Sequence, residues 1–138
     1  MAGDWRKRDR TLRRLRAALR SFIGHTQCGE MMTRKSQPSR ASIPRYAPDF
    51  CIFLIVRRKN PLVPHIAIEV LAPGDTVTKL HSRLKSYFES GVKEAWIIDP
   101  VDLYAERWNR PSLPPPVIHA LTSPLLPGFE LLLSELFA

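Results

Sequence analysis

Two apolar runs that lie close together limit what this chain can fold into. Residues 50–56 (FCIFLIV) are almost continuously apolar, and residues 65–71 (HIAIEVL) are apolar except at their first position and at Glu69. Neither run approaches the length needed to cross a bilayer as a helix. Both have the length of strands that are buried on both faces. The sequence therefore predicts two buried strands.

The segments after these runs alternate between helix and strand. We expect a helix from Thr76 to Ser90, because Pro73-Gly74-Asp75 breaks the preceding strand and Gly91 ends the helix. Further strands are expected at 95–98, 103–108 and 117–121, a turn at 126–129, a strand-to-helix segment at 131–137, and loops at 57–64 and 111–116. This order of strands and helices predicts an α/β fold.

The N-terminal third has a different character. The residues from Asp9 to Ile23 predict an amphipathic helix, with Gly24 as its stop. Its polar side carries Arg10, Arg13, Arg14, Arg16 and Arg20. Residues 25–47 show no period and are expected to be irregular. We therefore divide the chain into a basic helix with a linker (1–47) and an α/β core (48–138).

The charge is concentrated in that N-terminal third. Residues 1–50 have a net charge of +8, and residues 51–138 have a net charge of zero. A polyanionic partner such as nucleic acid would explain this asymmetry, with the five arginines as its contacts, and a solvated tail would explain it equally well. Two cysteines and the lack of a signal peptide indicate a reducing, cytoplasmic location and no membrane partner.

Glu69 is the most informative residue for chemistry. A charged carboxylate inside an apolar strand is costly unless it is paired or bound to a metal. The alternatives are an edge strand with Glu69 facing solvent, or a partner such as Arg83. Asp49 opens the neighbouring strand, although Pro-Asp is more often a turn. If the two carboxylates meet, they form an oxygen-rich site suited to Mg²⁺.

The expected helix at 76–90 carries a basic face. Lys79, Arg83 and Tyr87 are spaced four residues apart and share one side. This face is either a solvated stripe or a group directed at the carboxylates, where Lys79 or Arg83 would neutralise charge on a phosphate. The residues leave both readings open.

Several blocks together resemble one protein family. They are Pro48-Asp49 before a strand, IAIEVLAPGD at 66–75, YFESGVKEAWIIDP at 87–100 and LPGFELLLSELF at 126–137. From Pro48 to the C-terminus the chain resembles the Uma-type restriction endonucleases of the PD-(D/E)xK nuclease superfamily. This resemblance implies a restriction-endonuclease-like mixed sheet flanked by helices. It also implies that Asp49, Glu69 and the carbonyl of Val70 bind a metal ion.

Two departures from the family pattern bear on activity. Leu71 occupies the position where the superfamily motif has a lysine. The Uma-type family instead carries its lysine on the helix, and Arg83 occupies that position here. Arginine keeps the charge but does not readily transfer a proton, so Lys79 is the second candidate. The N-terminal third does not match the family pattern, which begins with a helix and a strand hairpin, so we expect a fold truncated on that side.

These observations predict a Mg²⁺-dependent endonuclease that hydrolyses double-stranded DNA. Asp49 and Glu69 would hold the metal, and Arg83 or Lys79 would stabilise the transition state. The alternatives are an inactive relic of the nuclease fold that binds nucleic acid or protein, and an interaction protein whose basic helix binds an acidic partner. A homodimer is compatible with the sequence.

Overall fold

The computed structural model describes residues 2–34, 48–55, 63–110 and 116–138. The remaining parts of the expected loops at 25–47, 57–64 and 111–116 lie outside the described residues. In chain order the elements are α1 (Ala2–Thr26), β1 (Gly29–Thr33), β2 (Phe50–Leu54), β3 (Ile66–Val70), α2 (Val77–Ser90), β4 (Glu94–Asp99), β5 (Tyr104–Trp108), β6 (Pro116–Val117), β7 (Ala120–Ser123), β8 (Leu126–Leu132) and α3 (Leu133–Leu136).

The main sheet has six strands in the order β1-β2-β3-β4-β5-β6. Neighbouring strands are antiparallel except β3 and β4, which are parallel and are joined by the crossover helix α2. A second sheet consists of β7 and β8. The expected α/β fold, a mixed sheet flanked by helices, is confirmed, and the two apolar runs form the strands β2 and β3 near its centre.

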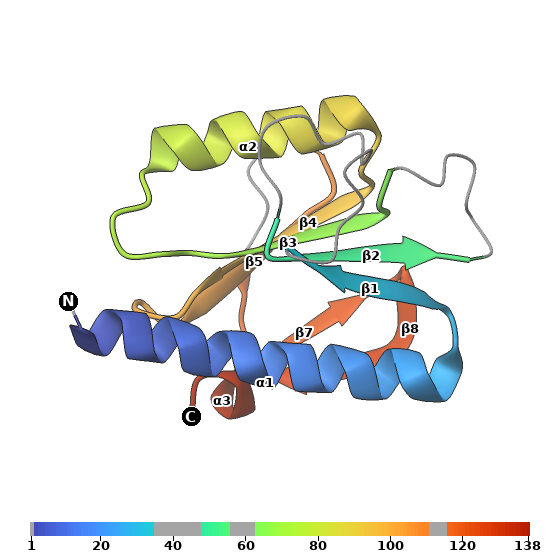
Figure 1. The fold of residues 1–138 in the computed structure, drawn as a ribbon, viewed down its shortest axis with the longest axis horizontal. Coiled ribbons are helices and arrows are strands. Elements are labelled where there is room, and N and C mark those ends of the chain that lie inside the picture. Colours follow the sequence, from blue (N-terminus) through green and yellow to red (C-terminus); the bar gives the residue numbers. More distant parts are fainter. Residues whose placement is uncertain (1, 35–47, 56–62, 111–115) are drawn as a thin grey trace.

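The two faces of the main sheet are covered by different elements (Figure 1). Even-numbered side chains of β2, β3 and β4 pack against α1, β7, β8 and α3, and odd-numbered side chains face α2. All ten residues of β2 and β3 are buried. Burial on both faces explains the nearly continuous apolar runs. It also places Glu69, an odd-numbered residue, on the α2 face.

The N-terminal helix is longer than the sequence pattern indicated. It extends from Ala2 to Thr26, whereas we expected Asp9 to Ile23 with a stop at Gly24. The helix continues through Gly24 and ends where Gln27 adopts a positive φ of 52°. Leu15 and Leu19 are fully buried in the core shared with the strands. No helix among the described residues is long and apolar enough to span a membrane.

A strand lies where an irregular linker was expected. β1 pairs with β2 in antiparallel register, from Gly29 opposite Leu54 to Thr33 opposite Phe50. A Cβ atom at Gly29 would collide with the carbonyl oxygen of Phe53, so this close pairing requires glycine. The segment is short and lies at the sheet edge, where only part of each side chain is buried, so it leaves no periodic pattern in the sequence.

The C-terminal region also differs from expectation. The segment 117–121 was expected to be one strand, but β6 pairs with β5 and β7 pairs with β8. The expected turn at 126–129 lies inside β8. The pairing of β7 with β8 contains a register shift, so not every backbone N–H of β8 is needed for a hydrogen bond between the two strands. Pro127, which has no N–H, and Gly128 can therefore lie inside β8.

Helix α2 begins and ends close to where the sequence predicted. Thr76 is its N-cap and accepts a hydrogen bond from the backbone N–H of Lys79. Gly91 is its C-cap, with a φ of 107° that favours glycine. These caps fix the helix over the sheet so that Tyr87 is buried beneath it.

The packing of α1 predicts a measurable contribution to stability. Leu19→Ala should lower the free energy of unfolding by about 2–5 kcal/mol, because it leaves a cavity between α1 and the sheet. Urea denaturation followed by circular dichroism measures this change. Arg16→Ala, on the exposed side of the same helix, should change the free energy by no more than about 0.5 kcal/mol. An equal loss of unfolding free energy in the two variants would contradict a core shared by α1 and the sheet.

Candidate active site

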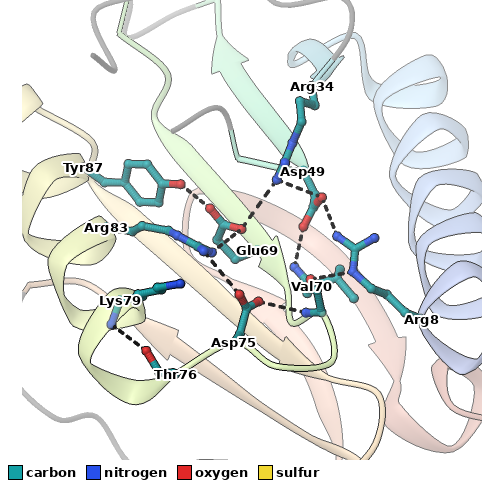
Figure 2. Close-up of polar contacts among 11 residues, drawn as sticks. Arg8, Arg34, Asp49, Glu69, Val70, Asp75, Thr76, Lys79, Arg83 and Tyr87 are labelled. Carbon is teal, nitrogen blue, oxygen red and sulfur yellow. Dashed lines mark hydrogen bonds and ion pairs between the residues drawn. The ribbon is translucent and has the colours of Figure 1, made fainter. Parts of the chain in front are cut away.

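The pairing of β2 with β3 brings two carboxylates together. Phe50 lies opposite Ile68, so Asp49 and Glu69 are the next residues at this end of the strand pair. The position of Arg34 shows how close they are, because its Nη2 atom lies 3.3 Å from Oδ1 of Asp49 and 4.0 Å from Oε2 of Glu69. The two carboxylates therefore converge on one position (Figure 2).

Asp49 is held by three donors. Nη2 of Arg8 donates to Oδ1 at 2.9 Å, and Nη2 of Arg34 contacts the same oxygen. The backbone N–H of Val70 donates to Oδ2 at 2.8 Å. Asp49 is 8% exposed, and an ionised carboxylate at this depth requires such partners.

Glu69 is buried more deeply, at 2% exposure. Its Oε1 accepts a hydrogen bond from the hydroxyl of Tyr87, and its Oε2 lies 3.6 Å from Nη1 of Arg83. Burial raises the pKa of Glu69 to about 7, and the negative charge of Asp49 also raises it. The hydrogen bond from Tyr87 and the positive charges of Arg83 and Arg34 act in the opposite direction and lower the pKa. A carboxyl of this kind is costly to ionise unless a cation lies close to it.

The hydroxyl of Tyr87 acts as a donor. Burial raises the pKa of Tyr87 above its usual range, and the charge of Glu69 adds to this effect. The phenol therefore stays protonated and fixes the orientation of the carboxyl group. With Oε1 of Glu69 held in this way, Oε2 is the oxygen that faces the position shared with Asp49.

The basic residues of α2 are not equivalent. Arg83 lies between two carboxylates, because its Nη2 also donates to Oδ1 of Asp75 at 3.3 Å. Oδ2 of Asp75 accepts the backbone N–H of Ala72 and fixes the turn after β3. Lys79 has an exposed side chain, and none of the ion pairs found among the described residues includes it. The geometry thus brings Arg83, rather than Lys79, to Glu69 (Figure 2).

The five arginines predicted to bind nucleic acid lie on a different surface. Arg13, Arg16 and Arg20 are exposed, and Arg10 and Arg14 both donate to the backbone oxygen of Ala138. Within the described part of the chain, none of the hydrogen bonds or ion pairs joins these five arginines to Asp49 or Glu69. Arg13, Arg16 and Arg20 thus form an exposed basic face of α1 and are not part of the carboxylate site.

Two arginines of the site, Arg8 and Arg34, were not among the residues predicted from the sequence. Arg8 is four residues before Leu12 and seven before Leu15, so it continues the apolar stripe of α1 by one turn. A basic residue within an apolar stripe indicates a buried partner. Because the helix was expected to begin at Asp9, Arg8 was not recognised as part of the stripe. Arg34 follows β1, which had no recognisable pattern.

The oxygen atoms of the site are of the kind that a hard divalent cation takes as ligands. Among the described residues, no group of three or more His, Cys, Asp or Glu side chains is arranged to hold a metal ion. Two carboxylates and the carbonyl of Val70 are nevertheless the kind of oxygen set that binds Mg²⁺, which retains several waters. The guanidinium of Arg34 shows that the position between Asp49 and Glu69 accommodates positive charge.

The fold is shared with a solved structure. A "putative nuclease belonging to DUF820" from Anabaena variabilis superposes with a TM-score of 0.76 at 15% sequence identity. The match covers 95% of this chain and 80% of that one. At this level of identity, the likeness establishes the fold alone. Among proteins with curated descriptions, none matches this chain.

The sequence match to a family is broader than the motifs suggested. The Uma2 family, described as "Putative restriction endonuclease", matches residues 1–134. The match includes the N-terminal third, for which the motifs gave no resemblance, and α1 and β1 lie in that part of the chain. The chain therefore belongs to the Uma2 family.

Proposed function

We propose that this protein is a Mg²⁺-dependent endonuclease that hydrolyses phosphodiester bonds of double-stranded DNA. The observation that carries this proposal is the convergence of two buried carboxylates, Asp49 and Glu69, on one position at the end of the β2–β3 pair. Burying two carboxylates side by side opposes stability unless the site serves a cation. Membership of the Uma2 family supports nucleic acid as the substrate class.

The proposed cation ligands are the side chains of Asp49 and Glu69 and the carbonyl oxygen of Val70. A divalent cation bound there would supply Lewis-acid activation of water and would offset charge on the scissile phosphate. Tyr87 would keep Glu69 in one orientation through Oε1. The backbone N–H of Val70 would do the same for Asp49 through Oδ2.

Arg83 is the proposed electrostatic group for the phosphate. It is 17% exposed and lies 3.6 Å from Glu69, so it is close enough to share a substrate with the carboxylates. A guanidinium binds phosphate oxygens through two parallel hydrogen bonds. Because arginine does not release a proton near neutral pH, its role is limited to neutralising the charge that develops on the phosphate.

The exposed arginines of α1 are proposed to attract the DNA backbone. Arg13, Arg16 and Arg20 project from one side of the helix into solvent, and their charges are available to phosphates without regard to base sequence. Helix α1 also carries Arg8 to the carboxylate site, so the basic face and the site are joined by one rigid element.

A second candidate is a nucleic-acid-binding module without turnover. The specific observation in its favour is that arginines already contact both carboxylates. A guanidinium–carboxylate pair already neutralises the negative charge that would attract a metal ion. This candidate retains DNA binding and predicts neither metal binding nor cleavage.

The first prediction for this function concerns Glu69. Glu69→Gln removes one anionic ligand and retains the shape of the side chain. Mg²⁺-dependent cleavage of plasmid DNA should fall by about 100-fold or more, since even residues that only support metal ligands contribute about 10–100-fold. Gel assays with purified protein measure the rate, and circular dichroism confirms that the variant is folded.

The matched control is Glu89→Gln, which changes an exposed carboxylate of α2 that is paired with Lys85. It should cleave at the wild-type rate. Wild-type cleavage by Glu69→Gln would remove Glu69 from the active site. A wild-type protein that binds DNA but neither binds Mg²⁺ nor cleaves DNA would favour the binding module.

The second prediction concerns the basic face of α1. The logarithm of the DNA affinity should fall linearly with the logarithm of salt concentration, because neutralised phosphates release counterions. Replacing Arg16 and Arg20 by glutamine should reduce this slope by about two. Fluorescence anisotropy with a labelled random duplex measures it.

A variant with Lys85 and Lys93 replaced by glutamine removes the same charge from exposed positions outside α1. Its salt slope should equal that of the wild type. If the salt slope falls by the same amount in both double variants, net charge alone explains the binding and the basic face of α1 has no special role.

A further inference from the structure

We infer that Arg8 is a further residue of the active site, an internal cation that competes with the divalent ion for Asp49 and the carbonyl of Val70. This inference rests on the proposed function, because it concerns the affinity of the same site. It assigns to α1 a direct part in setting how tightly the metal ion binds.

The contacts of Arg8 coincide with the proposed metal ligands (Figure 2). Its Nη2 donates to Oδ1 of Asp49 at 2.9 Å, and its Nε donates to the carbonyl oxygen of Val70 at 3.1 Å. One guanidinium therefore spans two of the three expected ligands. A planar fork with a fixed separation between its donors suits this bridging contact.

The position of Arg8 on α1 makes the contact persistent. The side chain is 15% exposed and lies in line with Leu12 and with the buried residues Leu15 and Leu19 of the same helix. Packing of α1 against the sheet thus holds the guanidinium at the site.

Competition follows from charge rather than from a lack of lone pairs. A carboxylate has about four acceptor positions, and a carbonyl oxygen has two. A divalent ion bound to Asp49 and Val70 would nevertheless lie next to the guanidinium, and like charges at such separations repel strongly in a buried site. The ion binds fully only when Arg8 withdraws from these oxygens.

The other two arginines are less able to control the site. Arg34 is 55% exposed and can move into solvent. Arg83 has a second carboxylate partner in Asp75, so it has an alternative contact when it leaves Glu69. Of the three, Arg8 is the one that bridges two proposed ligands from a packed helix.

The experiment is a Mn²⁺ titration followed by isothermal calorimetry and by electron paramagnetic resonance of free Mn²⁺. We compare the wild type with Arg8→Gln and with Arg6→Gln, which removes the same charge from an exposed position on the same helix. Arg8→Gln should bind Mn²⁺ about tenfold tighter or more, because charge-assisted hydrogen bonds contribute on that scale. Arg6→Gln should match the wild type.

Unchanged or weaker Mn²⁺ binding by Arg8→Gln would overturn the inference, and weaker binding would make Arg8 a support for Asp49. If the wild type binds Mn²⁺ and Arg8→Gln does not differ from it, only the inference fails. If neither protein binds Mn²⁺, the proposed metal site fails and the inference fails with it.

Arg8→Lys provides a test if Arg8→Gln does not fold. Lysine keeps the charge and the aliphatic stem, but a compact ammonium group does not reproduce the planar fork that spans both acceptors. This variant should bind Mn²⁺ more tightly than the wild type by a smaller factor. Thermal unfolding in the absence of metal confirms that each variant is folded, and equal Mn²⁺ affinity in a folded Arg8→Lys protein would overturn the inference.

Discussion

Two buried carboxylates side by side require positive charge, and the arrangement of the structure around the site follows from this requirement. Asp49 and Glu69 lie at one end of the β2–β3 pair. Three arginines from separate parts of the chain meet them: Arg8 from α1, Arg34 after β1 and Arg83 from α2. Segments that are distant in sequence are thereby joined at one point.

The same ion pairs connect stability with function. Without a metal ion, the arginines offset the cost of burying Asp49 and Glu69. In the proposed enzyme, a divalent cation would take over part of that role, and the arginines would become available to phosphate groups. The site thus combines a stabilising arrangement with a functional one, and the balance between them depends on how firmly each guanidinium is held. Arg8, fixed by the packing of α1, is held most firmly in this account.

Sequence reasoning predicted the elements whose signals are local. The strands β2 and β3 were visible because burial on both faces makes them apolar throughout, and α2 was visible because Thr76 and Gly91 mark its ends. Glu69 was a candidate because a carboxylate inside an apolar strand is costly, and Asp49 because it opens the neighbouring strand. Arg83 was a candidate because of its spacing on the helix and because of the family resemblance.

Elements that depend on distant partners were not predicted. β1 is a partly buried edge strand, and its pairing with β2 bridges a long stretch of sequence, so no local period indicates it. Arg8 was missed for a related reason. Its place in the apolar stripe of α1 becomes evident only when the helix starts at Ala2, and its partners, Asp49 and Val70, are far away in sequence.

The central claim is that Asp49 and Glu69 bind one divalent cation, and a crystal soaked in Mn²⁺ tests it most directly. We expect an anomalous difference peak at about 2.0–2.6 Å from a carboxylate oxygen of each residue. We also expect the guanidinium of Arg8 to have moved away from Asp49. An absence of anomalous density at this position, with Arg8 still bridging Asp49 and Val70 at saturating Mn²⁺, would contradict the account.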